Sequence, residues 1–159
     1  MRAYLQRLPA ALAGIVLAVV ALGARAQSPA CHGAPSAQRV LISVEGVRST
    51  QGFVVASIFG ADRSRFLKDD GAIFVFRDPA QRGVTPLCFF LPAPGDYAVV
   101  VFHDANANGR LDLGFVGIPI EGYGFSNNVR PVLRAPSFES VAFQAVAGDT
   151  RLHIRLRYP

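Results

Sequence analysis

Concentrated positive charge is missing from this sequence, although its 16 Lys and Arg residues outnumber its 11 Asp and Glu residues. Three of the arginines lie in an N-terminal segment that we expect to be removed, so 13 basic side chains remain against 11 acidic ones. The remaining basic residues form no cluster, whereas nucleic acid is bound by a concentrated positive face. The sequence therefore predicts no nucleic-acid partner.

Other features are absent as well. The sequence contains no convincing amphipathic helix and no internal repeat, which argues against a helical bundle and a repeat architecture. Its two cysteines and three histidines have no spacing typical of a zinc site. Ser126 lies outside any nucleophile-elbow motif, so no nucleophile arrangement typical of a hydrolase is present.

Residues 1–26 have the parts of a secretory signal peptide. Two arginines form a positive start, an apolar run covers residues 8–23, and the small residues Ala24 and Ala26 precede the expected cleavage before Gln27. A retained N-terminal anchor is the alternative. No later segment is long or apolar enough to span a bilayer. We therefore expect a periplasmic or secreted protein with no membrane span after cleavage.

Strand signals recur along the rest of the chain, separated by turn residues. The run at residues 97–103 is apolar on both faces, which indicates a central strand. After a flexible lead at residues 27–38, we predict one domain at residues 39–159. Its fold class is all-β, a single antiparallel β-sandwich of immunoglobulin-like or transthyretin-like type. The roughly seven strands expected from these signals are residues 40–44, 53–59, 72–77, 87–91, 97–103, 139–146 and 150–158.

Two cysteines, Cys31 and Cys88, follow the signal peptide. Export brings them into an oxidising compartment, where cysteines pair by default, so we predict a disulfide between them. A buried free thiol at Cys88 is the alternative, because this residue lies in an apolar strand-like run. Cys31 is a weaker candidate for a lipid anchor, since no apolar residue stands three positions before it.

The loop after the central strand has the spacing of a calcium site. Hard oxygen donors recur at alternate positions, and Gly109 permits the sharp turn that such loops need. Position 12 of the loop is Phe115 and no helices flank it, which excludes an EF-hand. The side chains at loop positions 1, 3, 5 and 9 are Asp104, Asn106, Asn108 and Asp112, the carbonyl of Arg110 stands at position 7, and Glu121 is a further candidate ligand.

Ca²⁺ is therefore the predicted cofactor. A metal-free turn is the alternative, because Asn, Asp and Gly also favour loops whose side chains bond to their own backbone.

Four stretches of the chain together resemble the signature of a bacterial exported family, domain of unknown function 2141. The resemblance extends from about Val40 to Tyr158 and implies a secreted or periplasmic β-domain with no assigned activity. Ala105 and Ala107 stand where that family often has an acidic residue or Gly, at positions expected to point outward. The stretches are Gly95–Val99, His103–Asp104, the loop from Asn106 to Asp112, and Gly117–Asn128.

The last of these stretches has two interpretations. Tyr123, Phe125 and Asn127 could form a recognition loop beside the metal, with aromatic side chains that contact a ligand. Alternatively, the loop folds onto the sheets and its aromatics cover a sheet edge.

These observations lead to two hypotheses about function. The first is an exported, non-enzymatic binding or accessory module with a structural calcium loop, whose partner is an envelope protein or polymer. The second is a small periplasmic enzyme of hydrolase type that uses His103 and Glu121 for acid–base chemistry.

Overall fold

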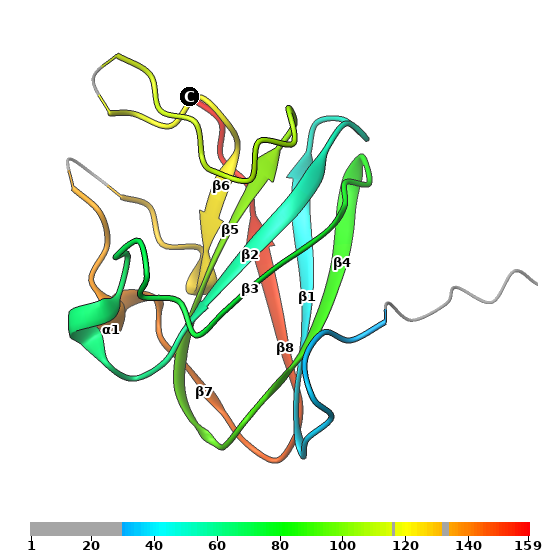
Figure 1. Cartoon of the computed structure of the whole chain (residues 1–159), viewed down its shortest axis with the longest axis vertical. Helices are drawn as coiled ribbons and strands as arrows, with labels where there is room; N and C mark the ends of the chain where they lie inside the picture. Colours follow the sequence, from blue (N-terminus) through cyan, green and yellow to red (C-terminus); the bar gives the residue numbers. More distant parts are fainter. Residues whose placement is uncertain (1–29, 116, 132–133) are drawn as a thin grey trace, which may run out of the picture.

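Eight β-strands in two sheets make up most of the regular structure among residues 30–115, 117–131 and 134–159, which the computed structural model describes (Figure 1). The protein is therefore mostly β, as predicted. Within these residues helix is limited to η1 (Arg63–Arg65), η2 (Ser126–Asn128) and α1 (Phe138–Val141), and none is long and apolar enough to cross a membrane. The predicted signal peptide lies outside the described residues.

The first sheet has three strands in the order β4–β1–β8, which are β4 (Gly83–Leu91), β1 (Gln38–Val47) and β8 (Gly148–Arg155). β1 runs antiparallel to β4 but parallel to β8. The prediction of a purely antiparallel arrangement is therefore wrong at this pair. Most of the chain separates β1 from β8, so no tight turn sets their relative direction, and a long connection permits parallel pairing.

The second sheet has β5 (Gly95–Asp104) at its centre. One side of β5 pairs with β2 (Phe53–Phe59), beyond which lies β3 (Phe74–Pro79). The other side pairs with β6 (Tyr123–Phe125) and with β7 (Phe143–Ala145). The strand expected to be central is therefore central.

Both sheets contribute side chains to one apolar cluster. Alternate residues of each strand face it, because successive side chains in a strand point to opposite faces. Its most buried members, each at most 2% exposed, are Val40, Ile42, Val44 and Val47 of β1, Val54, Ala56 and Ile58 of β2, Leu87, Phe89 and Leu91 of β4, Val99 and Val101 of β5, Ala145 of β7 and Ile154 of β8.

A second, smaller apolar cluster lies on the opposite face of β5. Ala98 of β5 and Phe59 of β2 pack there with Phe125, Phe138 and Val141. β5 is therefore covered on both faces, which explains why its sequence is apolar throughout.

The predicted strand at residues 139–146 is only partly correct. Its first half is the helical turn α1, and strand structure is limited to the three residues of β7. Phe138 and Val141 are both buried in the second cluster. Residues three apart lie on one face of a helical turn but on opposite faces of a strand, so burial of both side chains selects the helix.

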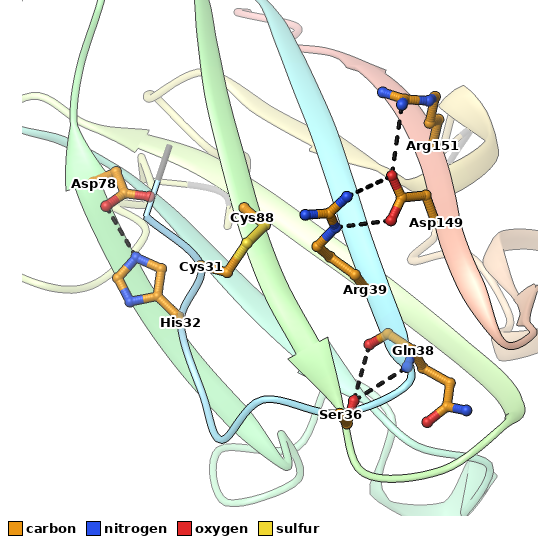
Figure 2. The surroundings of a disulfide bond; sticks show 9 residues. All are labelled: Cys31, His32, Ser36, Gln38, Arg39, Asp78, Cys88, Asp149 and Arg151. Atoms are coloured by element: carbon orange, nitrogen blue, oxygen red, sulfur yellow. Dashed lines mark hydrogen bonds and ion pairs between the residues drawn. A yellow bond between two sulfur atoms is a disulfide. The ribbon is translucent and has the colours of Figure 1, made fainter. Parts of the chain in front are cut away.

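The predicted disulfide joins Cys31 to Cys88, with the two Cα atoms 4.4 Å apart (Figure 2). The next residue, His32, is also bonded to β4. Its N–H donates to the Cys88 carbonyl and its own carbonyl accepts from the N–H of Phe90, both at 2.9 Å. Its ring stacks on Phe76 and its Nε2 lies 2.9 Å from a carboxylate oxygen of Asp78. The segment that starts at Cys31 is thus bonded to β4 of one sheet and β3 of the other.

We expect loss of the disulfide to destabilise the protein strongly. A Cys31→Ala, Cys88→Ala double variant frees a loop with a sequence separation of 57 residues. On the chain-entropy account this lowers the free energy of unfolding by about 4 kcal/mol. Urea denaturation followed by circular dichroism measures the change. Reductant should produce the same loss in the wild type and none in the double variant, and equal unfolding midpoints would contradict the prediction.

Candidate metal-binding loop and its surroundings

Asp104 is the last residue of β5 and begins the candidate loop. Its side chain is fully buried at 0% exposure. One carboxylate oxygen accepts the N–H of Asn108 at 3.0 Å and the other accepts the N–H of Gly109 at 2.8 Å. Because a buried carboxylate is costly unless it is hydrogen-bonded, these two bonds determine the path of the loop.

Asp112, at the other end of the loop, is held by two side-chain amides. Asn106 donates to one of its oxygens at 2.7 Å and Asn108 donates to the other at 2.9 Å. The bond from Asn108, and then that from Asn106, lower the pKa of the Asp112 carboxyl, because each stabilises the charged form. The oxygen-bearing side chains that the sequence spaces apart are thus brought into contact.

The amide oxygens of the same two asparagines bond to the loop backbone. That of Asn106 accepts from the N–H of Asn108 at 3.1 Å, and that of Asn108 accepts from the N–H of Arg110 at 3.0 Å. Gly109 has φ +80°, a left-handed conformation that glycine adopts without a steric penalty. The Arg110 side chain is exposed.

Glu121 joins the two ends of the loop. Its carboxylate oxygens accept the N–H of Ala105 at 3.2 Å and the N–H of Asp112 at 3.1 Å. Glu121, which the sequence predicted as a further ligand, therefore belongs to the same hydrogen-bonded unit as the loop.

The composition of the loop limits what it can bind. Within residues 30–115, 117–131 and 134–159, no three His, Cys, Asp or Glu side chains lie close enough together to hold a metal ion. A cation here would therefore depend on the amide oxygens of Asn106 and Asn108 as well as on carboxylates, a mixed oxygen set that suits Ca²⁺ rather than zinc.

His103 is buried beside the loop at 2% exposure. Its Nδ1 lies 2.9 Å from the hydroxyl of Tyr158 and its Nε2 lies 3.0 Å from the Gln51 carbonyl. Both ring nitrogens therefore have protein partners, and the side chain links β5 to the C-terminus and to the turn before β2.

Tyr158 is the residue that sequence reasoning missed at this site. Arg48 lies over its ring at 3.8 Å, and burial raises the pKa of its hydroxyl. A β-carbon at Gly122 would overlap the ring. This glycine is the only sequence signal for the contact, and it does not identify the partner.

The three proposed recognition residues have different surroundings. Phe125 is 7% exposed inside the second apolar cluster. The amide of Asn127 donates to the carbonyls of Ser140, at 3.3 Å, and Ala142, at 2.8 Å. These contacts favour the interpretation in which this stretch covers the sheet. Tyr123 is half-buried and, with Leu111 of the loop, lines a cavity of about 750 Å³.

We expect the contribution of Asp112 to stability to depend on pH. Its pKa is lowered in the folded state, so its contribution is complete above the ordinary Asp pKa and is lost as the pH falls through the lower folded value. The difference in unfolding midpoint between wild type and Asp112→Asn should therefore narrow from neutral to acidic pH. Exposed Asp69 offers a matched control, since Asp69→Asn should track the wild type throughout. A difference that stays constant with pH would contradict the prediction.

Comparison with known proteins places the chain in a family without adding an activity. A family model described as "Uncharacterized protein conserved in bacteria (DUF2141)" matches residues 42–153, which include most of both sheets and the whole candidate loop. No curated protein and no solved structure gives a significant match. The chain belongs to this uncharacterised bacterial family.

Proposed function

We propose that the protein is an exported, non-enzymatic binding or accessory module, a β-sandwich of immunoglobulin-like or transthyretin-like type whose loop at residues 104–112 binds Ca²⁺. The disulfide supports export, because such bonds persist in oxidising compartments. The common apolar cluster of the two sheets supports the sandwich. Its place is the periplasm or the extracellular medium, and its partner is an envelope protein or polymer.

The contact of Asp112 with both asparagines carries the calcium proposal. In this arrangement the amide N–H groups point at the carboxylate and the amide oxygens point at the backbone. Rotation of the two amides would turn their oxygens toward Asp112. That geometry is repulsive unless a cation lies between the oxygens, and Ca²⁺ takes carboxylate and amide oxygens together. The loop is therefore arranged so that an ion can replace the amide-to-carboxylate bonds.

The enzymatic alternative has less support from the geometry. General acid–base chemistry needs a proton-carrying group within reach of a substrate. Both ring nitrogens of His103 have protein partners, and both oxygens of Glu121 accept backbone N–H groups. These contacts fit residues that hold the loop in place.

Thermal unfolding with Ca²⁺ and then EDTA tests the calcium loop. Within the loop only Asp104 and Asp112 bring negative charge, and Glu121 adds one carboxylate from downstream, so we expect weak binding, on the order of 10⁻⁴ to 10⁻³ M. Millimolar Ca²⁺ should raise the melting temperature of the wild type, and EDTA should reverse the shift. Asp112→Ala should abolish it.

Two further variants complete this test. Asp104→Ala should also abolish the shift, although loss of its buried bonds is expected to destabilise the fold, so Asp112→Ala is the deciding variant. Asp69→Ala, in a different exposed loop, should keep the full shift. A wild type whose melting temperature ignores Ca²⁺, or an Asp112→Ala variant that responds normally, would refute the proposed ion site.

Activity profiling tests the non-enzymatic assignment. We expect wild type, His103→Ala and Glu121→Gln all to be inactive on esters, phosphate esters, glycosides and peptides. If the wild type turns over a substrate and Glu121→Gln loses this activity at an unchanged melting temperature, the enzyme hypothesis replaces the binding-module hypothesis.

A further inference from the structure

Three of the four strands that end the orders β4–β1–β8 and β3–β2–β5–β6 have partners over part of their outer edges. Outside β4, His32 receives a backbone bond from Phe90 and donates one to Cys88, both at 2.9 Å. Outside β8, Asn128 donates to the His153 carbonyl at 2.8 Å and accepts from the Arg155 N–H at 2.7 Å.

β6 is covered by the chain that follows β8. Tyr123 and Arg157 exchange backbone bonds of 2.9 and 2.8 Å, which join the two sheets at this side. Cover of this kind shortens the edge that is open to another strand, which is one way in which β proteins avoid unwanted association.

β3 differs from these three strands. It is the end strand of its sheet, and its start is apolar and open to solvent: Ile73 is 43% exposed, Phe74 41% and Val75 63%. An exposed, apolar end strand is a template for pairing with another strand. A cavity of about 190 Å³ lies beside it, lined by Phe74, Val75 and Phe76 of β3 and by residues of β4 and of the segment before β1.

The hydrogen bonds of the sheet show which backbone groups of β3 point away from β2. Ala80 donates to the carbonyl of Gly52 at 3.2 Å, in line with the unbroken register between β2 and β3. Bonded and non-bonded residues alternate in an antiparallel pair, so Val75, Arg77 and Pro79 direct their backbone groups outward. Pro79 has no N–H and is tolerated at such a position, which limits the open edge to Val75 and Arg77.

We propose that β3 pairs with β3 of a second copy of this chain, antiparallel and about a two-fold axis at Phe76. In this register the outward groups of Val75 in one copy face those of Arg77 in the other, and each such pair can exchange both of its N–H···O bonds. A two-fold axis generates the same pair twice. The β3–β2–β5–β6 sheet of one copy and that of the other then form one continuous sheet across the dimer.

Charge disfavours the register in which the axis lies one residue later. An axis one residue later would place Arg77 opposite its own copy, and like charges directly opposite each other destabilise a sheet. It would also place Val75 opposite Pro79, which has no N–H to donate. With the axis at Phe76, Arg77 lies opposite apolar Val75. Its guanidinium lies over the Phe53 ring of its own sheet, 4.6 Å from the ring centre. The proposal does not depend on calcium.

Sedimentation equilibrium of the disulfide-intact protein, from low micromolar to about 1 mM, tests the pairing. The wild type should approach the mass of two chains as its concentration rises. Val75→Pro removes an outward N–H that makes no bond to β2, so it should weaken self-association by about tenfold or more while the fold remains. Val75→Thr keeps the N–H and the strand preference, and should associate like the wild type.

Val75→Lys keeps the test decisive if the proline variant unfolds, because a charge at an outer strand blocks pairing without changing the backbone. It should also sediment as a single chain. A wild type that stays at the mass of one chain over the whole range would overturn the proposal. So would Val75→Lys dimerising like the wild type, which would place the contact elsewhere. A wild type that stays monomeric but binds a synthetic peptide of residues 72–79 would overturn the dimer, and would leave the edge open to a strand of another protein.

Discussion

Burial of β5 on both faces is the constraint on which the rest of the structure depends. One face of this strand contributes to the cluster between the sheets and the other to the smaller cluster with α1. A slip of one residue would take His103 and Asp104 at the end of this strand away from their hydrogen-bond partners, so the register of β5 is fixed. Its end therefore has a defined position, and that is where buried Asp104 starts the loop.

The residues that form the turn of this loop are also those of the proposed ion site. Three carboxylates, those of Asp104, Asp112 and Glu121, each accept two N–H groups from the loop. These hydrogen bonds stabilise the carboxylates of the loop without a metal ion. A calcium ion would compete with amide-to-carboxylate bonds rather than fill an unbalanced site, which is why we expect weak affinity and a modest gain in stability.

The outer edges of the sheets show how the rest of the chain completes the fold. The segment from Cys31 to His32 is fixed to β4 by the disulfide and reaches β3 through Asp78, so it holds the two sheets together at one side (Figure 2). Tyr123 and Arg157 join them at the other. β3 is left with an unpaired outer edge at Val75 and Arg77, and pairing with a second copy would cover it.

The amino-acid sequence by itself determined the mostly-β class, the central position of residues 97–103 and a strand within residues 150–158, and it predicted the Cys31–Cys88 bond. Each follows from local patterning or from the expected compartment, and needs no knowledge of which strands are neighbours. The spacing of the loop residues from Asp104 to Asp112 likewise predicted that their side chains would gather, because alternation is a local property of the backbone.

Only the tertiary structure decided the features that join distant parts of the chain. These are the parallel pairing of β1 with β8, the helical turn in place of a strand at Phe138, the contact of His103 with Tyr158, and the choice of β3 as the open edge. Each depends on contacts between side chains that are far apart in the sequence. Local patterns do not predict these contacts, because packing in the folded protein determines them.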